Sequence, residues 1–286
     1  MPISSMDNSN RTFDRIHDVS KIDGCNTRGV EYRWQTFSKE ISTIPVGGRA
    51  LDFGAGSLRE SFDLAVRGFS VTSIDLNGEL LGSYKSDYSW PDNGTTHELI
   101  GSDHLTDGLS KTDGKKFDLV TCFDVLEHID NPRAVLRELR THMKDDGKIF
   151  ITVPNGRSLF EIAWRVDLMI AHATNRYLRP GEPHVQRNSP GKWRQIVEES
   201  GFSIRQHEME IGFFVNTAAA LVQLPLTFGG RVLRKLGVNV DAASLSERIC
   251  SGRRMTALDV LDRKTKAILA PLYGWNLFVA TPKQFA

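Results

Sequence analysis

The chain has 286 residues, of which 40% are hydrophobic, so it is long enough to bury the core of one sizeable α/β domain. Its 36 Lys and Arg residues against 35 Asp and Glu residues give a formal net charge of +1, which excludes a global basic field for nucleic acid. The three cysteines, Cys25, Cys122 and Cys250, are widely separated. They fit neither a disulfide framework nor a cysteine-rich metal site, and they favour a reducing compartment.

The first segment, residues 1–28, is polar, and no apolar stretch follows a basic start in it. We therefore expect a polar tail and no secretory signal there. The remaining residues, 29–286, are predicted to form a single domain. Its first element is a helix, because four apolar residues recur with the spacing of one helical face: Val30, Trp34, Phe37 and Ile41.

Strands and helices then alternate along the chain. The pattern predicts strands over residues 49–53, 69–75, 96–101, 117–123, 148–155, 202–209 and 275–282. Helices are predicted over residues 57–68 and from Pro132 and Pro190, because Asn131 and Ser189 place a capping residue before each proline. Strands that alternate with helices indicate an α/β fold with a mostly parallel sheet.

Two connections are longer than such a sheet needs. They are residues 156–188, after the fifth strand, and residues 213–271, after the sixth. Both insertions are candidates for substrate-facing elements, and packing decoration is the equally weighted alternative for each.

The second insertion joins an apolar stretch to a basic one. Between Arg231 and Lys266 there are nine Lys or Arg residues and four Asp or Glu residues, a local balance of +5. This favours a helical lid, with Met255, Leu258 and Leu261 facing inward at helical spacing. Peripheral contact with an anionic membrane through residues 212–271 is a second hypothesis, and the two are compatible.

The stretch "LDFGAGSLRE" places Gly54 and Gly56 directly after the first strand. These glycines either allow a tight turn or also let a ligand lie against the backbone. Ser57 and Glu60 match a capping box that begins the next helix. All of these signals agree on a turn from strand to helix at this point.

A nucleoside ligand is indicated by Asp75, at the end of the second strand. A carboxylate at that position can accept hydrogen bonds from both hydroxyls of a ribose. Arg59 stands where a dinucleotide fingerprint has its third glycine, which argues against an NAD-binding site.

Four motifs occur in order along the chain: "ALDFGAGS", "SIDLN", "GSDHL" and "FDLVTCFDVLEHIDNP". Together they resemble the class I S-adenosylmethionine-dependent methyltransferases, roughly from Tyr32 to Ile211 and in the last strand. The last motif and "PHVQRNSPGKWRQIVEESGF" look most like the quinone-biosynthesis O-methyltransferase group. The resemblance implies a doubly wound, Rossmann-like seven-stranded sheet with helices on both faces. Leu58 departs from the family pattern, which often has a third glycine there.

The resemblance also implies S-adenosylmethionine as cofactor and S-adenosylhomocysteine as product. It assigns Asp52 to the ammonium group through water, Asp75 to the ribose and Asp103 to the adenine amino group. The carboxylates could instead be solvated strand ends and caps. The full set of cofactor-binding residues that it implies is Asp52, Gly54, Ala55, Gly56, Asp75, Leu76, Asp103, His104 and Phe123.

Methyl transfer to a hydroxyl oxygen needs a proton acceptor beside the methyl group. His128, just past the fourth strand, is the first candidate for a general base, and a scaffold role is its alternative. His184 lies in a loop that resembles the substrate-side loop of the same group, where a substrate contact and an ordinary loop histidine are equally plausible. Glu127 is expected to be structural. The remaining histidines lack metal-ligand spacing, so no metal is expected.

The sequence thus predicts a methyltransferase acting by in-line transfer, mainly on oxygen, of a small-molecule, lipid-linked or sugar acceptor. Nucleic acid is not expected as a partner, because "FDVLEH" stands where amino-group methyltransferases carry an Asn/Asp-Pro-Pro-aromatic stretch. An NAD-type oxidoreductase and a non-catalytic binding module are the alternatives. A cytoplasmic protein is expected, with membrane contact as an additional hypothesis. The acceptor and the oligomeric state are not specified by these motifs.

Overall fold

A computed structural model describes the chain in nine pieces: residues 37, 39–76, 78–159, 161–162, 165, 184–215, 217–218, 221 and 253–284. Phe37 and residues 39–41 are helical, and Phe37 and Ile41 are buried, in agreement with the predicted first helix. Val30 and Trp34 lie outside the described residues, as do most of both insertions and Met255's side chain.

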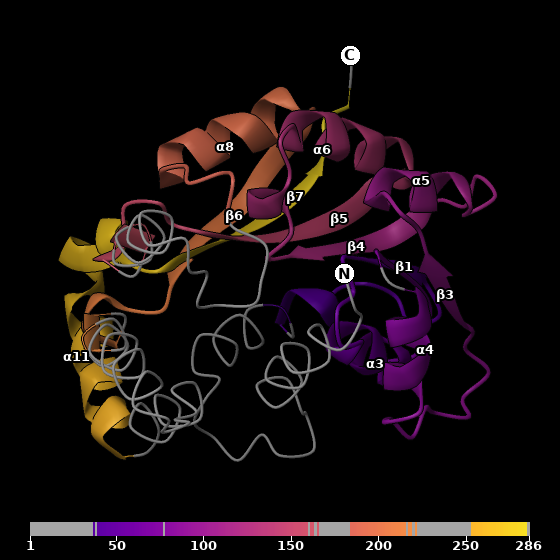
Figure 1. Cartoon of the computed structure of the whole chain (residues 1–286), viewed down its shortest axis with the longest axis horizontal. Helices are drawn as coiled ribbons and strands as arrows, with labels where there is room; N and C mark the ends of the chain where they lie inside the picture. The colour runs from indigo at the N-terminus through magenta and orange to yellow at the C-terminus, as the bar shows by residue number, and fades with distance from the viewer. Residues whose placement is uncertain are drawn as a thin grey trace, which may run out of the picture.

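Seven strands form one sheet in the order β3-β2-β1-β4-β5-β7-β6 (Figure 1). The strands are β1 (Arg49–Phe53), β2 (Ser70–Asp75), β3 (His97–Gly101), β4 (Phe117–Phe123), β5 (Met143–Pro154), β6 (Phe202–Glu210) and β7 (Trp275–Pro282). The first five run parallel, and β7 lies antiparallel between β5 and β6. The predicted sheet is confirmed. Its order reverses between β1 and β4, the place where ligands bind in such folds.

Helices cover both faces of the sheet, as expected (Figure 1). α3 (Arg59–Val66) and α4 (Gly78–Lys85) lie on one face, and α5 (Leu105–Ser110), α6 (Pro132–Thr141) and α8 (Pro190–Glu199) lie on the other. The short helices α4 and α5 were not predicted, because the two glycines of α4 and the six-residue length of α5 leave little periodic signal. Further helical elements among the described residues are η3 (Leu126–His128), α11 (Arg253–Leu269) and η4 (Ala270–Leu272).

The two faces of the sheet differ in polarity. On the α5, α6 and α8 face, the core is apolar along the strands, with Leu51 and Phe53 of β1 both buried in it. On the α3 face, Ala50 is buried in a second apolar cluster, but Asp52 follows it. Asp52 pairs with Ser73 of β2 and with Thr121 of β4. A polar row therefore crosses three strands just below their carboxyl ends.

The predicted caps at two prolines are confirmed, and the predicted capping box is wrong. Asn131 and Ser189 accept hydrogen bonds from backbone N–H groups three residues later, at 3.2 and 3.3 Å. Helix α3 instead begins after Leu58, which has a left-handed backbone with φ 62° and makes no side-chain cap. Ser57 therefore lies one residue before the N-cap position, which a capping box requires the serine to occupy.

The described part of the second insertion differs from the expected lid face. Leu261 is 40% exposed, so its predicted inward orientation is wrong. The neighbouring Asp262 is buried instead, and its carboxylate accepts hydrogen bonds from the backbone N–H groups of Phe214 and Val215 at 2.9 and 3.0 Å. These bonds attach α11 to the start of the insertion, and they require Asp262 rather than Leu261 to face inward.

Candidate active site

The two positions after β1 are occupied by glycine for different structural reasons. Both have positive φ angles, 78° at Gly54 and 47° at Gly56. A Cβ atom on Gly54 would lie 2.3 Å from the side chain of Val125, whereas one on Gly56 would meet no atom of the described chain within 4 Å. Gly54 is therefore required by the turn and by close packing. Gly56 leaves open space in which a ligand can approach the backbone.

Leu58 completes this turn in place of a third glycine. A left-handed backbone costs a non-glycine residue about 1 kcal/mol. The side chain is fully buried in a cluster with Ala55, Leu81 and Tyr84, and burying a leucine contributes about 1.5 to 3 kcal/mol. Burial therefore offsets the backbone strain, and it also fastens the turn to α4.

Asp75 faces the same turn from the end of β2. Its two carboxylate oxygens accept hydrogen bonds from the backbone N–H groups of Gly56 and Leu76, at 2.8 and 2.7 Å. An ionised carboxylate has about four lone-pair sites, so both oxygens can accept further bonds. The position is suitable for two adjacent hydroxyls, as the sequence predicts for a ribose.

Asp52 lies behind the turn, between the sheet and α3. It is 3% exposed, and its carboxylate accepts hydrogen bonds from Ser61 Oγ at 2.6 Å and Thr121 Oγ1 at 2.7 Å. Burial, with Glu60 nearby as the next cause, raises the pKa of Asp52 to about 7. Its direct partners are therefore hydroxyls of the core, and its predicted contact with an ammonium group through water stays a prediction.

The buried polar row continues beyond Asp52 to the edge of the sheet. Ser61 Oγ lies 2.6 Å from Ser73 Oγ, which lies 2.9 Å from Nε2 of His97. The His97 ring stacks on Trp90 with a centroid separation of 3.8 Å. Burial, together with the charge of Lys85, lowers the pKa of His97 to about 4, so this end of the row is neutral near pH 7.

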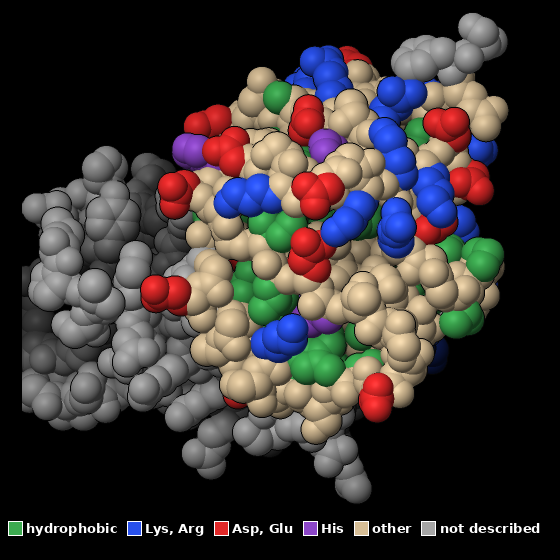
Figure 2. Space-filling view, turned by 90° about the vertical axis from the view of Figure 1, so that its right-hand side faces the viewer, with side chains coloured by type: hydrophobic (Ala, Val, Ile, Leu, Met, Phe, Trp, Pro, Cys, Tyr) green, Lys and Arg blue, Asp and Glu red, His purple; other side chains and the backbone are tan. Residues whose placement is uncertain are grey.

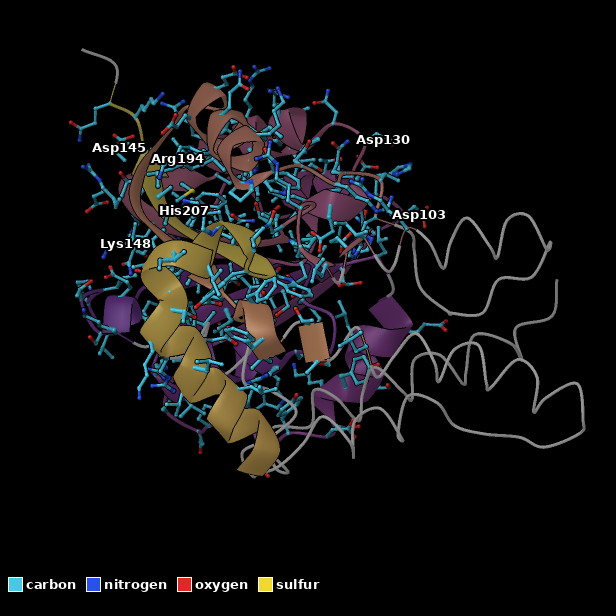
Figure 3. All side chains as sticks on the ribbon, turned by 90° about the vertical axis from the view of Figure 1, so that its left-hand side faces the viewer. Asp103, Asp130, Asp145, Lys148, Arg194 and His207 are labelled. Atoms are coloured by element: carbon cyan, nitrogen blue, oxygen red, sulfur yellow. The ribbon has the colours of Figure 1, made fainter. Side chains whose placement is uncertain are left out.

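The other predicted cofactor residues lie at the carboxyl edge of the sheet. Asp103 and His104 follow β3 and are exposed. Figure 3 shows Asp103 on the same side of the molecule as Asp130, which follows η3. Phe123 ends β4 and packs edge-on against Phe37, with centroids 5.7 Å apart. This arrangement is compatible with a nucleoside along β1, β2 and β3, and the individual assignments stay predictions.

The structure brings together His128 and His184, which are far apart in the sequence. Their ring centroids are 5.0 Å apart, with an interplanar angle of 75°. The contact depends on Glu127, because its carbonyl oxygen accepts hydrogen bonds from the N–H groups of Val185 and Gln186, at 2.8 and 2.9 Å. The end of the first insertion is thus docked directly on the segment that follows β4.

Two buried carboxylates surround this histidine pair. Glu161 Oε1 lies 2.8 Å from Nδ1 of His184, and Glu161 Oε2 lies 3.4 Å from Nε of Arg187. Glu127 Oε1 lies 3.9 Å from Nε2 of His128, which is longer than a hydrogen bond. Neither carboxylate was predicted as part of a site.

One set of side chains here can hold a metal ion. Glu127, His128 and His184 each offer one ligand atom, and these atoms lie within 4.8 Å of one another. The spacing of the histidines along the chain predicted no metal. This cluster depends on a tertiary contact across the insertion, so spacing could not predict it.

Asp124 is a further polar residue at this edge of the sheet, and no sequence motif predicted it. It follows β4 with a left-handed backbone of φ 55°. Its carboxylate accepts hydrogen bonds from Thr152 Oγ1 at 2.9 Å and from Trp275 Nε1 at 3.0 Å. The available signal was its position immediately after a buried parallel strand, where functional side chains gather.

Comparison with known proteins identifies the family of this chain. A model of the methyltransferase domain family matches residues 27–207, which is well over half of the chain. The chain belongs to this methyltransferase family. The family identified from the four motifs is therefore confirmed.

Individual relatives extend the likeness of this methyltransferase. A ubiquinone biosynthesis O-methyltransferase from Marinobacter nauticus is 31% identical over 80% of this chain and 83% of the relative. Relatives of the same name from Dechloromonas aromatica and Glaesserella parasuis are each 30% identical. In these two, the chain spans only about half of the relative's length, 56% and 46%.

Solved structures share the fold of this methyltransferase at low identity. A magnesium protoporphyrin IX methyltransferase from Synechocystis, with bound S-adenosylhomocysteine, is 14% identical with a TM-score of 0.53, covering 98% of this chain and 99% of that chain. A cyclopropane synthase from Mycobacterium tuberculosis is 12% identical with a TM-score of 0.59, covering 98% of both. Such different names on one fold show that the fold alone does not select an acceptor.

The glycine turn yields a prediction about stability. Gly54→Ala should lower the free energy of unfolding more than Gly56→Ala. Both substitutions place a Cβ on a left-handed residue, at about 1 kcal/mol, but only Gly54→Ala also drives it into Val125, which adds about 1 to 3 kcal/mol. Urea denaturation of the two variants measures the difference. Equal losses would show that Val125 yields without cost.

Asp52 yields a prediction about pH. Its raised pKa means that the folded protein binds the proton more tightly than the unfolded chain, so stability falls as pH rises from about 4 to about 7. Asp52→Asn removes this titration. The free energy of unfolding of the variant should therefore improve relative to the parent chain between about pH 5 and about pH 8. Urea denaturation at both pH values tests this, and a constant difference would contradict it.

Proposed function

We propose that the protein transfers a methyl group from S-adenosylmethionine to a hydroxyl oxygen of a small-molecule acceptor. The observation that carries this proposal is the grouping of two sites on one edge of the sheet. Open backbone at Gly56 faces Asp75 after β1 and β2, and the pair His128 and His184 lies beyond β4 and β5. The first suits a nucleoside and the second suits removal of a proton.

The residues present fit the cofactor in their chemistry. Asp75 would hold the ribose hydroxyls, the turn at Gly56 would lie against the methionine part, and Asp103 would reach the adenine amino group. When bound, the cofactor supplies a methyl group on a sulfonium that is already a good leaving group. The chain then has to align the acceptor oxygen, exclude water and accept a proton.

The alternatives have less support in the described residues. An NAD-type oxidoreductase would have a small residue at position 59, where Arg59 is instead 3% exposed within α3. A non-catalytic module would not need two histidines and two buried carboxylates at the substrate end of the fold. On the face nearest β3 and α5, Lys and Arg are interspersed with Asp and Glu (Figure 2). A protein surface that binds nucleic acid has a basic patch instead.

The domain limits and the finer acceptor class are also part of this proposal. We place the methyltransferase domain over residues 29–286, with insertions at about 156–188 and 213–271. The names of the curated relatives support an acceptor that carries a hydroxyl, and a lipid-linked or sugar acceptor is compatible with them.

For residues 212–271, the proposal is a lid that can also rest on an anionic membrane. Among the described helices, none has both the length and the apolar character needed to cross a bilayer. The local excess of Lys and Arg favours anionic lipid, at about 1 kcal/mol per basic residue near the surface. The full chain should pellet with anionic liposomes and not with neutral ones. Equal, negligible pelleting in both would leave only the lid.

The cofactor assignment is tested at Asp75. Asp75→Ala should weaken binding of S-adenosylhomocysteine by about 10- to 100-fold, the loss expected for charge-assisted hydrogen bonds to a ribose. Isothermal titration calorimetry measures this. Asp87→Ala, which changes an exposed aspartate near the end of α4, is the matched control and should bind as the parent does.

Two outcomes would overturn the assignment. One is an Asp75→Ala protein that stays folded and binds S-adenosylhomocysteine with unchanged affinity. The other is a parent chain that binds NAD and not S-adenosylhomocysteine, which would favour the oxidoreductase alternative.

A further inference from the structure

We propose that binding of the cofactor's ammonium group releases a proton from Asp52. Three positioning residues hold the Asp52 carboxyl ready for this release, namely Ser61, Ser73 and His97. The inference rests on the proposed function, which places the methionine part of the cofactor against the turn at Gly56. It goes beyond that function because it links cofactor affinity to pH, and because no sequence motif assigned a role to the three positioning residues.

Asp52 lies behind the turn at which the cofactor is placed. It stands two residues before Gly54, whose N–H donates to the carbonyl of Ile74 at 2.9 Å and ties the turn to β2. On the same turn, the carboxylate of Asp75 accepts a hydrogen bond from the N–H of Gly56 at 2.8 Å. A ligand here lies close to two carboxylates, which favour a positive group over a negative one. In the methionine part of the cofactor, that positive group is the ammonium.

The surroundings of Asp52 favour the neutral form of its carboxyl. The side chain is 3% exposed, and the charges that act on it, those of Glu60 in α3 and Asp75 after β2, are both negative. Arg59 of the same helix acts on Asp63. On β4, burial raises the pKa of the Cys122 thiol, which therefore adds no charge near pH 7. Burial, followed by Glu60, raises the pKa of Asp52 to about 7, so the carboxyl is protonated at about pH 6.

The row of hydroxyls beside Asp52 favours the opposite, ionised form. An ionised carboxylate can only accept, so Ser61 Oγ and Thr121 Oγ1 both donate to it, at 2.6 and 2.7 Å. Ser61 has one hydroxyl hydrogen, so Ser73 must donate to Ser61 Oγ across their 2.6 Å contact. Ser73 Oγ then accepts from Nε2 of His97 at 2.9 Å. Every hydrogen in the row points toward Asp52, and such chains strengthen one another.

The far end of the row depends on which ring nitrogen of His97 carries the proton. Nε2 faces Ser73, whereas Nδ1 is buried and has no hydrogen-bond partner among the described residues. A proton on Nδ1 would be a buried donor without an acceptor, so the proton on Nε2 is favoured. Trp90 stacks on the ring, and burial, with the charge of Lys85, lowers the pKa of His97 to about 4. The row therefore donates toward Asp52 without adding a charge.

The proposed step is an acid dissociation that is balanced in atoms and charge. The O–H bond of the Asp52 carboxyl breaks, its electron pair stays on the carboxylate, and the proton passes to a base of the buffer. The carboxylate keeps Ser61 and Thr121 as donors, which are already in place. Since the free protein binds this proton more tightly than the complex does, the affinity for the cofactor rises with pH up to about pH 7.

The experiment compares two ligands that differ in the ammonium group. Isothermal titration calorimetry of the full chain at about pH 6, in two buffers with different enthalpies of ionisation, measures the protons released on binding. S-adenosylhomocysteine, which carries the ammonium, should release about one proton and should bind about 10-fold more tightly at pH 8 than at pH 6. 5′-Methylthioadenosine has the same nucleoside without the ammonium, and it should release none. Asp52→Asn should release none with either ligand.

The positioning role is tested by the pH at which the affinity rises. His97→Phe removes the last donor of the row and should move the rise to higher pH by about one pH unit. His97→Gln keeps an N–H donor at a similar reach and should restore the parent profile. A purely structural role would lower the affinity equally at every pH.

A second stacked histidine provides the matched control. His207 lies on β6, at the opposite edge of the sheet from β3. Its Nε2 lies 3.0 Å from Asn276 Oδ1, and its ring stacks on Phe278 with centroids 4.2 Å apart. His207→Phe is therefore the same substitution in a similar setting, and it should leave the pH profile unchanged.

The outcomes separate this inference from the proposed function. A parent chain that binds S-adenosylhomocysteine without releasing a proton would overturn the inference alone, as would equal release with 5′-methylthioadenosine or undiminished release from Asp52→Asn. A His97→Phe profile that coincides with the parent profile would overturn the positioning role. The parent measurements need no variant, so they decide the proton release even if a substituted chain does not fold. A parent chain that binds no S-adenosylhomocysteine would overturn the proposed function itself.

Discussion

The parallel pairing of β1 with β2 and β4 is the constraint on which the whole site depends. Parallel strands end at the same edge of a sheet, so the turn at Gly56, the carboxylate of Asp75 and the segment that contains His128 necessarily meet there. The register then sets Ser73, Asp52 and Thr121 in one row beneath that edge. A shift of one residue would turn this row into the apolar face.

The edge is held by local arrangements that are unfavourable in isolation. Leu58 and Asp124 both have left-handed backbones, which non-glycine residues rarely adopt. Each is stabilised by its surroundings, Leu58 by full burial and Asp124 by hydrogen bonds from Thr152 and Trp275. Strain retained in this way clusters at functional sites, because the packing around such residues fixes the geometry that a ligand needs.

Local signals predicted the strands well and supplied the candidate residues of the site. The strands that end at Phe53 and Asp75 were correct because short buried strands and the turn residues after them are encoded locally. The capping box at Ser57 failed because the left-handed residue that follows it is stabilised by burial, which the sequence does not show. His128 and His184 were both candidates, but their contact was not predictable, because it closes over a long insertion.

The sequence by itself determined the fold and the strand ends at which we place the nucleoside. Gly54, Gly56 and Asp75 mark strand ends within a repeating pattern, and each acts through its own backbone or through a neighbouring strand. Only the tertiary structure decided the contacts at the end where we place the acceptor, where Glu161 meets His184 and the carbonyl of Glu127 accepts hydrogen bonds from the returning loop. These contacts join segments whose spacing along the chain carries no period, so their partners are selected by how the insertion packs on the sheet.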